Sequence, residues 1–531
     1  MMFDPITFEV INNALIYITE EMGIALRNSA YSHNIKERMD HSCAIFDADG
    51  YLIAQAEHIP VHLGSLPWAM TNLKNYFHDN NLTWQDGDIV LVNDPYISGT
   101  HLNDLTLVKP VFFDGTLIAF TANKAHHVDV GGETYGSISC DATSIYEEGI
   151  VLPPQKYFHR GVKSTKIENE YVNAVKNPEI ARGDLRAQVA ALNLGERRLH
   201  ELAVTYSPPI LFQVYKNIIR FGKEKMARIF EEFPSGEFSA EDCLESVSSE
   251  SNLTWIRVKL RKRDMVLEVD FTGTDDQVDS SFNAVLGGTL SAAFFAIKSI
   301  LDPDSDVNEG VLGQIHLIAP EGCLLNPMKP AAVSGGNLET SQRVADVVFK
   351  ALAKALPARV PAASNGSMNN IMAGGFEAEK NSHWVYYETT GGGSGARPNG
   401  DGIDGIHCNM TNTMNTPIET IEQNYPMEFV EFGLRNNSGG KGQWRGGEGI
   451  IRSWRLTTDK AQVTVMGERH HQQPWGLNGG GSGQCGETIL QRANGEIEIL
   501  GSKKSFEMRR GDILTIKTPG GGGYGHFDSA Q

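Results

Sequence analysis

The sequence predicts a mixed α/β chain of the α+β type with several domains and a β-rich, glycine-rich C-terminal region. Three patterns support this. Apolar residues recur at spacings of three and four in residues 5–29, 177–202 and 211–233, as in amphipathic helices. Residues 253–273 alternate apolar and charged side chains, as in half-buried strands. The last third carries strand-like segments between clusters of glycine, which fits the turns of an all-β region.

Length and composition fit a protein of two or three domains with a large core. The chain has 531 residues, and its 40% hydrophobic and 21% charged content is ordinary for a globular protein. We expect an N-terminal α/β region over residues 1–205, a middle α/β region over 206–370 and a β-rich region over 371–531. The six cysteines are scattered without a CxxC pair, which favours reduced thiols over disulfides or a zinc ribbon.

The charge balance argues against two classes of partner. The formal net charge is −19, whereas nucleic acids and anionic membranes need basic surfaces. No apolar run approaches the roughly 18 residues of a membrane span. The N-terminal MMFDPITFEV has no basic segment and no cleavage site, so we expect a cytoplasmic protein.

Near the N-terminus, a long helix is followed by a hairpin and a histidine-bearing loop. Asp4 and Pro5 supply an N-cap and a first-turn proline for the helix over residues 5–29. Cys43–Phe46 and Tyr51–Ala54 then flank a DADG turn. The charged cluster before this hairpin, which includes Asp40, is by spacing alone typical of a solvated strand edge. Pro60 lies between His58 and His62 and disfavours a chelating helix, so these histidines are expected at most to line the entrance of a site.

The segment from Asn93 to Gly132 is the centre of the predicted site. Leu105–Phe113 and Thr116–Ala122 read as two strands joined by the hairpin signal Asp114-Gly115. If these are the two turn residues, residue i faces residue 229 − i, and directly opposed residues lie about 5 Å apart. His101 and Asp104 then come against His126, provided that residues 101–104 form a loop or helical turn, because side chains alternate along a strand. Imidazole and carboxylate together suit Zn, Mn or Fe.

Three further features leave alternatives open. The run RVKLRKR, residues 257–263, fits the solvent face of a strand better than a polyanion site. The glycine turn at 334–337 precedes a helix and can bind an anion or simply cap the helix. The amide-rich loop at 407–417 can bind a carbonyl- and amide-bearing substrate or satisfy its own backbone. The sequence contains no phosphate-binding GxxxxGK[ST] and no GxSxG.

These landmarks resemble the hydantoinase B/oxoprolinase family across essentially the whole chain. The matching motifs are ERMDHSCAIFDADG, HIPVHLGS, NDPYISGTHLNDLTLVKPVF, AHHVDVGG, SGGNLETSQR, GDGIDGIHCNMTNTMNTPIE, GERHHQQPWGLNGG and GGGGYG. The family comprises B subunits of ATP-dependent hydantoinases and lactamases, the C-terminal half of 5-oxoprolinase, and subunits of acetone and acetophenone carboxylases. Several of the motifs are long, so the resemblance specifies the family more closely than the substrate.

The resemblance implies a site and a partner. The implied metal ligands are Asp40, His101, Asp104 and His126, with Zn as the expected metal and Mn or Fe as alternatives. His127 and Asp129 are expected to act beside the metal, in proton relay or in holding an imidazole. ATP and Mg are expected on a separate hydantoinase A-type subunit with an actin-like ATPase fold, paired with this chain in an (αβ)2 complex.

The function implied is that of the metal-binding B subunit of an ATP-dependent cyclic amide hydrolase. The partner would phosphorylate the amide of a small lactam or hydantoin, and metal-bound water in this chain would open the activated ring. The alternative is a subunit of an ATP-dependent ketone carboxylase, although such subunits tend to be longer and to need a further small subunit. A non-enzymatic scaffold for the A subunit is a third interpretation, which the intact ligand set disfavours.

Overall fold

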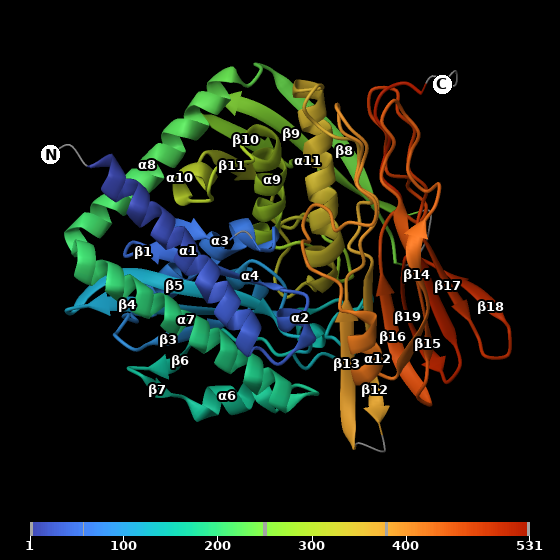
Figure 1. Ribbon diagram of the computed structural model, residues 1–531, viewed down its shortest axis with the longest axis horizontal. Helices are drawn as coiled ribbons and strands as arrows, with labels where there is room; N and C mark the ends of the chain where they lie inside the picture. Colours follow the sequence, from blue (N-terminus) through green and yellow to red (C-terminus); the bar gives the residue numbers. More distant parts are fainter. Residues whose placement is uncertain (1–3, 57, 248–251, 378–380, 528–531) are drawn as a thin grey trace.

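The computed structural model describes residues 4–56, 58–247, 252–377 and 381–527, and it combines long helices with four β-sheets (Figure 1). The N-terminal sheet and its helices lie at the left of the view, and the two C-terminal sheets lie at the right. The fourth sheet lies between and above them, together with α9 and α11. The mixed α+β class and the β-rich C-terminal part are therefore as predicted, whereas the domain boundaries remain a prediction.

The N-terminal sheet is antiparallel throughout and has the order β2-β1-β5-β4-β3-β6-β7. Its strands are β1 (His41–Asp47), β2 (Leu52–Gln55), β3 (Ile89–Val92), β4 (Asp104–Phe113), β5 (Thr116–His126), β6 (Gln155–His159) and β7 (Val162–Lys163). Both faces of the central strands are covered. Alternate residues pack on α1 and α7 on one face and on α3 on the other, so even polar residues at the strand ends are withdrawn from solvent.

The predicted helices are present with small differences in length. The helices before the middle sheet are α1 (Pro5–Ser29), α2 (His33–Lys36), α3 (His62–Asp79), α4 (Pro95–Ser98), α5 (Ile145–Glu148), α6 (Thr165–Val172), α7 (Pro178–Tyr206) and α8 (Pro208–Glu232). Asp4 caps α1 as predicted, because its carboxylate accepts from the backbone N–H groups of Ile6 and Thr7. Gly195 of α7 lies against Met22 of α1 and lets these two long helices pack closely.

The middle of the chain forms a four-stranded sheet in the order β11-β10-β9-β8, with helices against it. Its elements are β8 (Glu237–Glu245), β9 (Leu253–Arg263), β10 (Val266–Asp270), α9 (Leu286–Leu301), α10 (Glu309–Leu312), β11 (Ile315–Ile318), a π-helical turn (Gly336–Thr340) and α11 (Ser341–Ala355). The strand pair predicted over 253–273 is confirmed as β9 and β10. The basic residues of 257–263 alternate with buried ones and pair with acidic side chains such as Glu237, which is the solvent-face interpretation.

Two sheets make up the C-terminal region, in the orders β13-β12-β16-β19 and β14-β15-β20-β17-β18. Their elements are β12 (Asn370–Glu377), β13 (Ser382–Glu388), α12 (Ile418–Asn424), β14 (Met427–Arg435), β15 (Gly449–Leu456), β16 (Lys460–Met466), β17 (Glu487–Gln491), β18 (Ile497–Leu500), β19 (Lys503–Arg509) and β20 (Ile513–Lys517).

The glycine clusters of this region are used differently from the prediction. Single glycines such as Gly495, between β17 and β18, and Gly511, between β19 and β20, lie in tight turns, whereas the clusters lie in extended loops that pack backbone against backbone. A Cβ on Gly393 would lie 1.9 Å from the carbonyl oxygen of Gly447 and 2.4 Å from the nitrogen of Gly521. These loops therefore need glycine because side chains have no room, and turn formation is not the reason.

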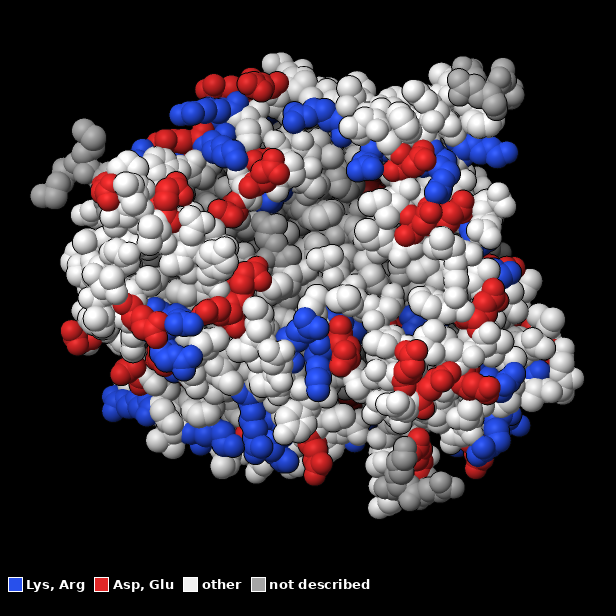
Figure 2. Space-filling view, in the orientation of Figure 1, with Lys and Arg blue, Asp and Glu red and all other residues white. Residues whose placement is uncertain are grey.

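The surface mixes charges of both signs. Figure 2 shows Lys and Arg interspersed with Asp and Glu on the face that carries α1, α7 and α8, with wide uncharged areas between them. Charge alone therefore marks no docking area on this face. Within the described ranges, none of the helices is both long enough and apolar enough to span a bilayer.

Candidate metal centre

The β4–β5 hairpin brings the predicted ligands together, with one correction to the register. Asp114 and Gly115 have positive φ and form the turn, and Phe113 pairs with Thr116 as expected. A bulge at Val111/Phe112 then shifts the pairing by one residue. Asp104 consequently lies opposite His126, where the unbulged register would have placed residue 103. Directly opposed residues share a face, so both side chains point to the α3 side of the sheet.

His101 reaches the same place from a loop, as predicted. The short helix α4 ends at Gly99, whose φ of 81° reverses the chain direction, and residues 102 and 103 form a turn before β4 begins. Two buried asparagines hold this loop. The amide of Asn93 donates to the carbonyl of Leu102 (3.0 Å), and the amide of Asn103 donates to that of His127 (3.0 Å).

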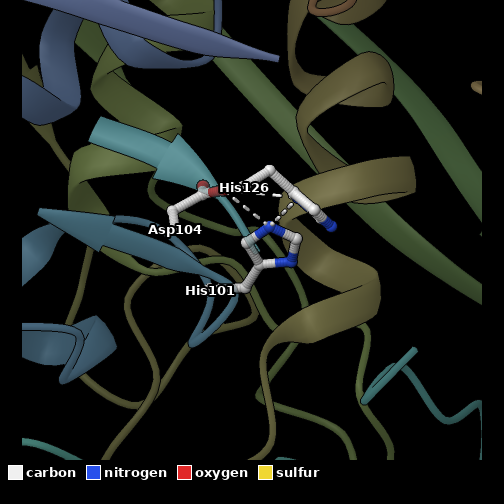
Figure 3. Close-up of side chains that lie close together, drawn as sticks. All are labelled: His101, Asp104 and His126. Atoms are coloured by element: carbon white, nitrogen blue, oxygen red, sulfur yellow. Dashed lines mark hydrogen bonds and ion pairs between the residues drawn. The ribbon is translucent and has the colours of Figure 1, made fainter. Parts of the chain in front are cut away.

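The three side chains converge on a point inside the protein (Figure 3). Nε2 of His101 lies 3.1 Å from Oδ1 of Asp104 and 3.2 Å from Nδ1 of His126, and the remaining separation, from Oδ1 of Asp104 to Nδ1 of His126, is 3.4 Å. Ligand atoms about 2.0–2.1 Å from one tetrahedral ion lie about 3.3 Å from each other. All three residues are at most 2% exposed. The donor set and its spacing fit a first-row divalent metal.

Polar atoms on the outer side of the triad lack partners, and the ring nitrogens among them are those that do not face the convergence point. Nδ1 of His101, Nε2 of His126 and Oδ2 of Asp104 are buried and make no hydrogen bond with the described residues. Burying such groups unpaired costs stability, so the cluster is not explained by its contribution to folding. Among the described residues, His101, Asp104 and His126 form the one group of three His, Cys, Asp or Glu side chains with ligand atoms close enough to share an ion.

Electrostatics give these residues the ionisation that metal ligands need. Burial raises the pKa of Asp104, but the charge of His101 and the facing imidazoles of His101, His126 and His62 outweigh burial and hold that pKa well below its usual range. Burial lowers the pKa of His126, against the opposing effect of its hydrogen bond to Asp104. At neutral pH an ionised carboxylate therefore faces a neutral imidazole, and both can bind a cation without first losing a proton.

Asp40, the fourth ligand implied by the resemblance, lies at the edge of the cluster. Its Oδ2 is 3.9 Å from Nδ1 of His126 and 3.8 Å from the guanidinium of Arg38, and its side chain lines the pocket beside the three ligands. The backbone carbonyl of Asp40 accepts from the N–H of His126 (3.1 Å), which ties the two segments together. Its role as a ligand remains a prediction, since it lies farther from the cluster than the other three.

Arg38 organises the surroundings of this carboxylate. It is fully buried and donates to the carbonyl of Tyr387 (3.2 Å) and the hydroxyl of Thr389 (3.0 Å). Its guanidinium also lies over the ring of Tyr387, 4.6 Å from the centroid, and that ring stacks on His126 at 4.7 Å. Arg38 thus couples β13 to the imidazole of a candidate ligand. Sequence spacing carries no indication of this role.

The two histidines of the HIPVH segment lie in different surroundings. His62 begins α3 and is buried, with Nε2 3.5 Å from Oδ2 of Asp104 and Nδ1 2.9 Å from the hydroxyl of Ser42. His58 instead pairs with Glu20 of α1 at 3.1 Å. Pro60 does break the segment, but the break places His62 at a helix start that faces the cluster. His62 therefore lines the site, and His58 is turned toward α1.

His127 and Asp129 lie on the other side of the hairpin. His127 follows His126 directly and points to the opposite face, where it meets the hydroxyl of Tyr171 (2.8 Å) and Oε1 of Gln188 (3.0 Å). Asp129 accepts from the hydroxyl of Ser137 (3.0 Å) and pairs with Lys176 (3.1 Å). Neither is among the residues that line the pocket, so the catalytic roles predicted for them stay predictions.

The pocket beside the cluster has apolar and hydroxyl-bearing walls. It is lined by Asp40, Ile59, Val61, His62, His101, Asp104, His126, Asn337, Leu338, Met368, Tyr387, Thr389, Met410, Thr411 and Thr413. The 407–417 loop thus supplies part of the wall. Its asparagines bind protein oxygens, as Asn412 does with the carbonyl of His58 and Asn415 with that of Thr389. These asparagines therefore satisfy the backbone of other segments, and substrate binding by the loop stays a prediction.

The glycine turn before α11 is capped by the protein itself. The carboxylate of Glu148 accepts from the backbone N–H groups of Val333 (3.1 Å) and Ser334 (2.8 Å). Of the two alternatives for this turn, the structure therefore supports capping, with an internal carboxyl group in the place of a ligand.

Fold and site together define a multi-sheet α+β protein with a buried His-Asp-His cluster of metal-binding type. The chain belongs to the hydantoinase B/oxoprolinase family, which it matches over residues 4–527. It is 34% identical to 5-oxoprolinase 1 of Arabidopsis thaliana over 98% of this chain and 42% of that protein. It is 32% identical to the putative B subunit of a D-/L-hydantoinase from Pseudomonas sp. (strain NS671), over 98% and 90% of the two chains. The chain thus spans about two fifths of the 5-oxoprolinase relative and most of the hydantoinase relative.

Solved structures agree with this assignment. The ATP-dependent caprolactamase from Pseudomonas jessenii superposes with a TM-score of 0.92 at 28% identity, over 99% of this chain and 92% of that one. Acetone carboxylase superposes with a TM-score of 0.88 at 17% identity, over 98% and 76% of the chains, which shows a shared fold.

Proposed function

We propose that this protein is the metal-binding B-type subunit of an ATP-dependent cyclic amide hydrolase. The observation that carries the proposal is the buried triad of His101, Asp104 and His126, with ligand atoms 3.1–3.4 Å apart. The names of relatives add the reaction class, because a hydantoinase, 5-oxoprolinases and a caprolactamase all point to cyclic amides. Asp40 is proposed as a further ligand on account of its position beside His126.

The partner and the metal complete the proposal. Zn²⁺, or else Mn²⁺ or Fe²⁺, would supply Lewis acidity and lower the pKa of a water molecule at the triad. ATP and Mg²⁺ would be handled by an A-type subunit in a cytoplasmic (αβ)2 complex, and that subunit would phosphorylate the amide oxygen of the ring. Phosphorylation makes the amide carbon a better electrophile, so that hydrolysis can open the ring and release phosphate.

The residues of this chain would do three things in that reaction. His101, Asp104 and His126 would hold the metal. The threonines and Asn337 would orient the ring by hydrogen bonds, and the closed pocket would exclude bulk water. His127 and Asp129 are proposed to contribute to proton transfer. They follow the end of β5 and do not line the pocket, so they would act indirectly.

The ketone carboxylase remains the second candidate from the sequence. Its support is the likeness to acetone carboxylase, which at 17% identity concerns the fold. The hydrolase is preferred because the caprolactamase is both closer in sequence and more completely covered.

The first test is metal content. We expect about one equivalent of Zn, Mn or Fe in the purified chain by elemental analysis and a loss of that metal in His126→Ala. His316→Ala, on the exposed face of β11, is the matched control and should keep the parental content. Equal metal in parent and His126→Ala would refute the site.

The second test is the reaction. Together with an A-type subunit, lactam- or hydantoin-dependent ATP turnover is expected from the parent and is expected to be lost in His101→Ala. ATP turnover that depends on a ketone and bicarbonate would favour the carboxylase instead.

A further inference from the structure

We infer that the ring bound beside the triad is an uncharged cyclic amide and not a ring that bears a carboxylate. This inference rests on the proposed function, and it narrows the substrate class. The inferred substrate differs from the one that the name 5-oxoprolinase implies for a relative at 34% identity, because 5-oxoproline carries a carboxylate.

The pocket walls suit the two halves of such a ring. Ile59, Val61, Leu338, Met368 and Met410 provide apolar contacts for methylene groups. The polar part of the wall is a series of threonine hydroxyl groups. The hydroxyl oxygens of Thr389 and Thr413 lie 2.8 Å apart, and those of Thr413 and Thr411 lie 3.4 Å apart. A hydroxyl both donates and accepts, so this series can serve an amide C=O or N–H.

Asn337 adds an acceptor without a partner. Its side chain is 6% exposed, lines the pocket, and leaves Oδ1 without a hydrogen bond among the described residues. A ring N–H would satisfy this buried oxygen. Together, hydroxyl groups and an orphaned acceptor match a neutral amide.

The pocket offers no counter-charge for an acid. Among the described residues that line it there is no Lys or Arg, whereas Asp40 and Asp104 are both present. A carboxylate on the ring would be buried next to carboxylates, and an unpaired buried charge costs several kcal/mol, roughly, in proteins. A divalent metal on the triad would face the amide being hydrolysed and would first balance its own carboxylate ligands.

The nearest buried cations are already engaged. The ammonium of Lys124 donates to the hydroxyl of Ser65 (3.1 Å), the carbonyl of Ser98 (2.8 Å) and the hydroxyl of Thr100 (3.0 Å), which uses all three of its N–H groups. The terminal nitrogens of Arg38 donate to the carbonyl of Tyr387, to the hydroxyl of Thr389 behind the pocket wall and to the amide oxygen of Asn34. Neither lines the pocket.

The nearby helix start is also unavailable to an anion. Glu148 already accepts the backbone N–H groups of Val333 and Ser334 there, as described above. The free N–H groups of the turn that leads into α11 are therefore already occupied by a protein carboxyl group before any ligand arrives.

Movement of the 407–417 loop to open the pocket would not add a positively charged side chain from that loop. The volume of the pocket is about 20 Å³, so a ring can enter only after part of the wall moves. The 407–417 loop is one irregular part of the wall, and it is held by bonds such as the N–H of Met414 to the carbonyl of Arg38 (3.1 Å). That loop contains no Lys or Arg, so its displacement brings no positive charge to the ring.

The test compares two rings that differ by a single group. Calorimetric titration of the full chain, loaded with Zn²⁺, with 2-pyrrolidinone and with 5-oxoproline measures the effect of the carboxylate on the same five-membered lactam. We expect 2-pyrrolidinone to bind at least about tenfold more tightly, a difference of about 1.4 kcal/mol. Equal or tighter binding of 5-oxoproline, or no binding of either ring, would overturn the inference.

A lysine introduced into the pocket wall tests whether the lack of positive charge causes the preference for a neutral ring. Thr411→Lys is expected to shift the preference toward 5-oxoproline by about tenfold, while Thr457→Lys, at an exposed loop, keeps the parental ratio. An unchanged ratio in folded Thr411→Lys counts against the inference. If that variant does not fold, the parental ratio decides alone.

This binding experiment is independent of the proposed reaction. A chain that prefers the neutral ring but supports no ring-dependent ATP turnover with an A-type subunit would leave the inference standing and refute the hydrolase.

Discussion

Asp104 and His126 lie directly opposite each other on the β4–β5 ladder, with Oδ1 of the carboxylate 3.4 Å from Nδ1 of the imidazole. The pair exists because one bulge at Val111/Phe112 shifts the register of the hairpin by a single residue. Without that shift, residue 103 would face His126 and Asp104 would point to the other side of the sheet. The candidate metal centre therefore depends on a backbone irregularity seven residues away along β4.

The Asp104 carboxylate should decide metal affinity. Asp104→Asn keeps the shape of the side chain but removes the charge. We therefore expect Zn²⁺ affinity to fall by more than about 100-fold, which is more than the loss typical of residues that contact a ligand but not the metal. Competition with a chromophoric chelator measures this. Asp264→Asn, at an exposed turn with positive φ that Asn also accepts, is the control and should bind as the parent does. Parental affinity in Asp104→Asn would mean that the triad does not hold the ion.

The two histidines of the HIPVH segment should differ in effect. His62→Ala removes the imidazole that faces Oδ2 of Asp104 at 3.5 Å, so metal affinity should fall by about 10- to 100-fold, as for other contacts that orient a ligand. His58→Ala removes a partly exposed pair with Glu20 and should leave affinity unchanged. The same chelator competition compares both variants, and a larger loss in His58→Ala would reverse the assignment.

Much of this arrangement follows from the sequence, and the rest follows from contacts that spacing does not encode. The Asp114-Gly115 turn and the flanking strands predict that His101, Asp104 and His126 meet. The bulge is not predictable, since nothing in the letters around Val111 requires it. The spacing of His58 and His62 underestimates the role of His62 in the site. Pro60 excludes a helix that contains both histidines, but a helix can begin after Pro60, as α3 does at His62.

Arg38 and Tyr387 escape prediction for a different reason. They meet through a contact between residues 349 positions apart, and local patterns carry no information about such a pair. The alternation of side chains could have placed His127 correctly, because a residue next to His126 must point to the opposite face.

His127 should matter to stability first. Its ring joins the hydroxyl of Tyr171 to Gln188 in the core between β5 and α7. His127→Ala leaves both partners unpaired and opens a cavity, so we expect the free energy of unfolding to fall by about 2–4 kcal/mol with metal content unchanged. Chemical denaturation and elemental analysis measure the two effects. Full stability together with lost turnover would instead support the predicted proton-relay role.

The glycine clusters should be intolerant of any side chain. In Gly393→Ala the new Cβ would lie 1.9 Å from the carbonyl oxygen of Gly447, so the loops must separate and the C-terminal region should lose several kcal/mol, roughly, of stability. Gly433→Ala, in the exposed part of β14 with nothing within 4 Å of its Cβ, should be neutral or slightly stabilising. Thermal unfolding compares them, and equal melting temperatures would contradict the close packing.

Glu339 should make stability depend on pH. Burial, reinforced by the charge of Glu468, raises the pKa of Glu339 from its ordinary 4.5 to about 8. A group whose pKa is higher in the folded state binds its proton more tightly there, so its stabilising effect is complete below about pH 4.5 and is lost as the pH rises through about 8. Between about pH 6 and pH 9 we expect a loss of about 2–3 kcal/mol from this group alone.

Glu339→Gln isolates that effect. Glutamine reproduces the neutral side chain, and its Oε1 can still accept from the N–H of Met368 and the amide of Asn370. The variant should match the parent near pH 6 and exceed it near pH 9, as measured by urea unfolding at both values. A constant difference between the two proteins across this range would mean that Glu339 is ionised throughout, with Lys503 then providing enough positive charge to offset its burial.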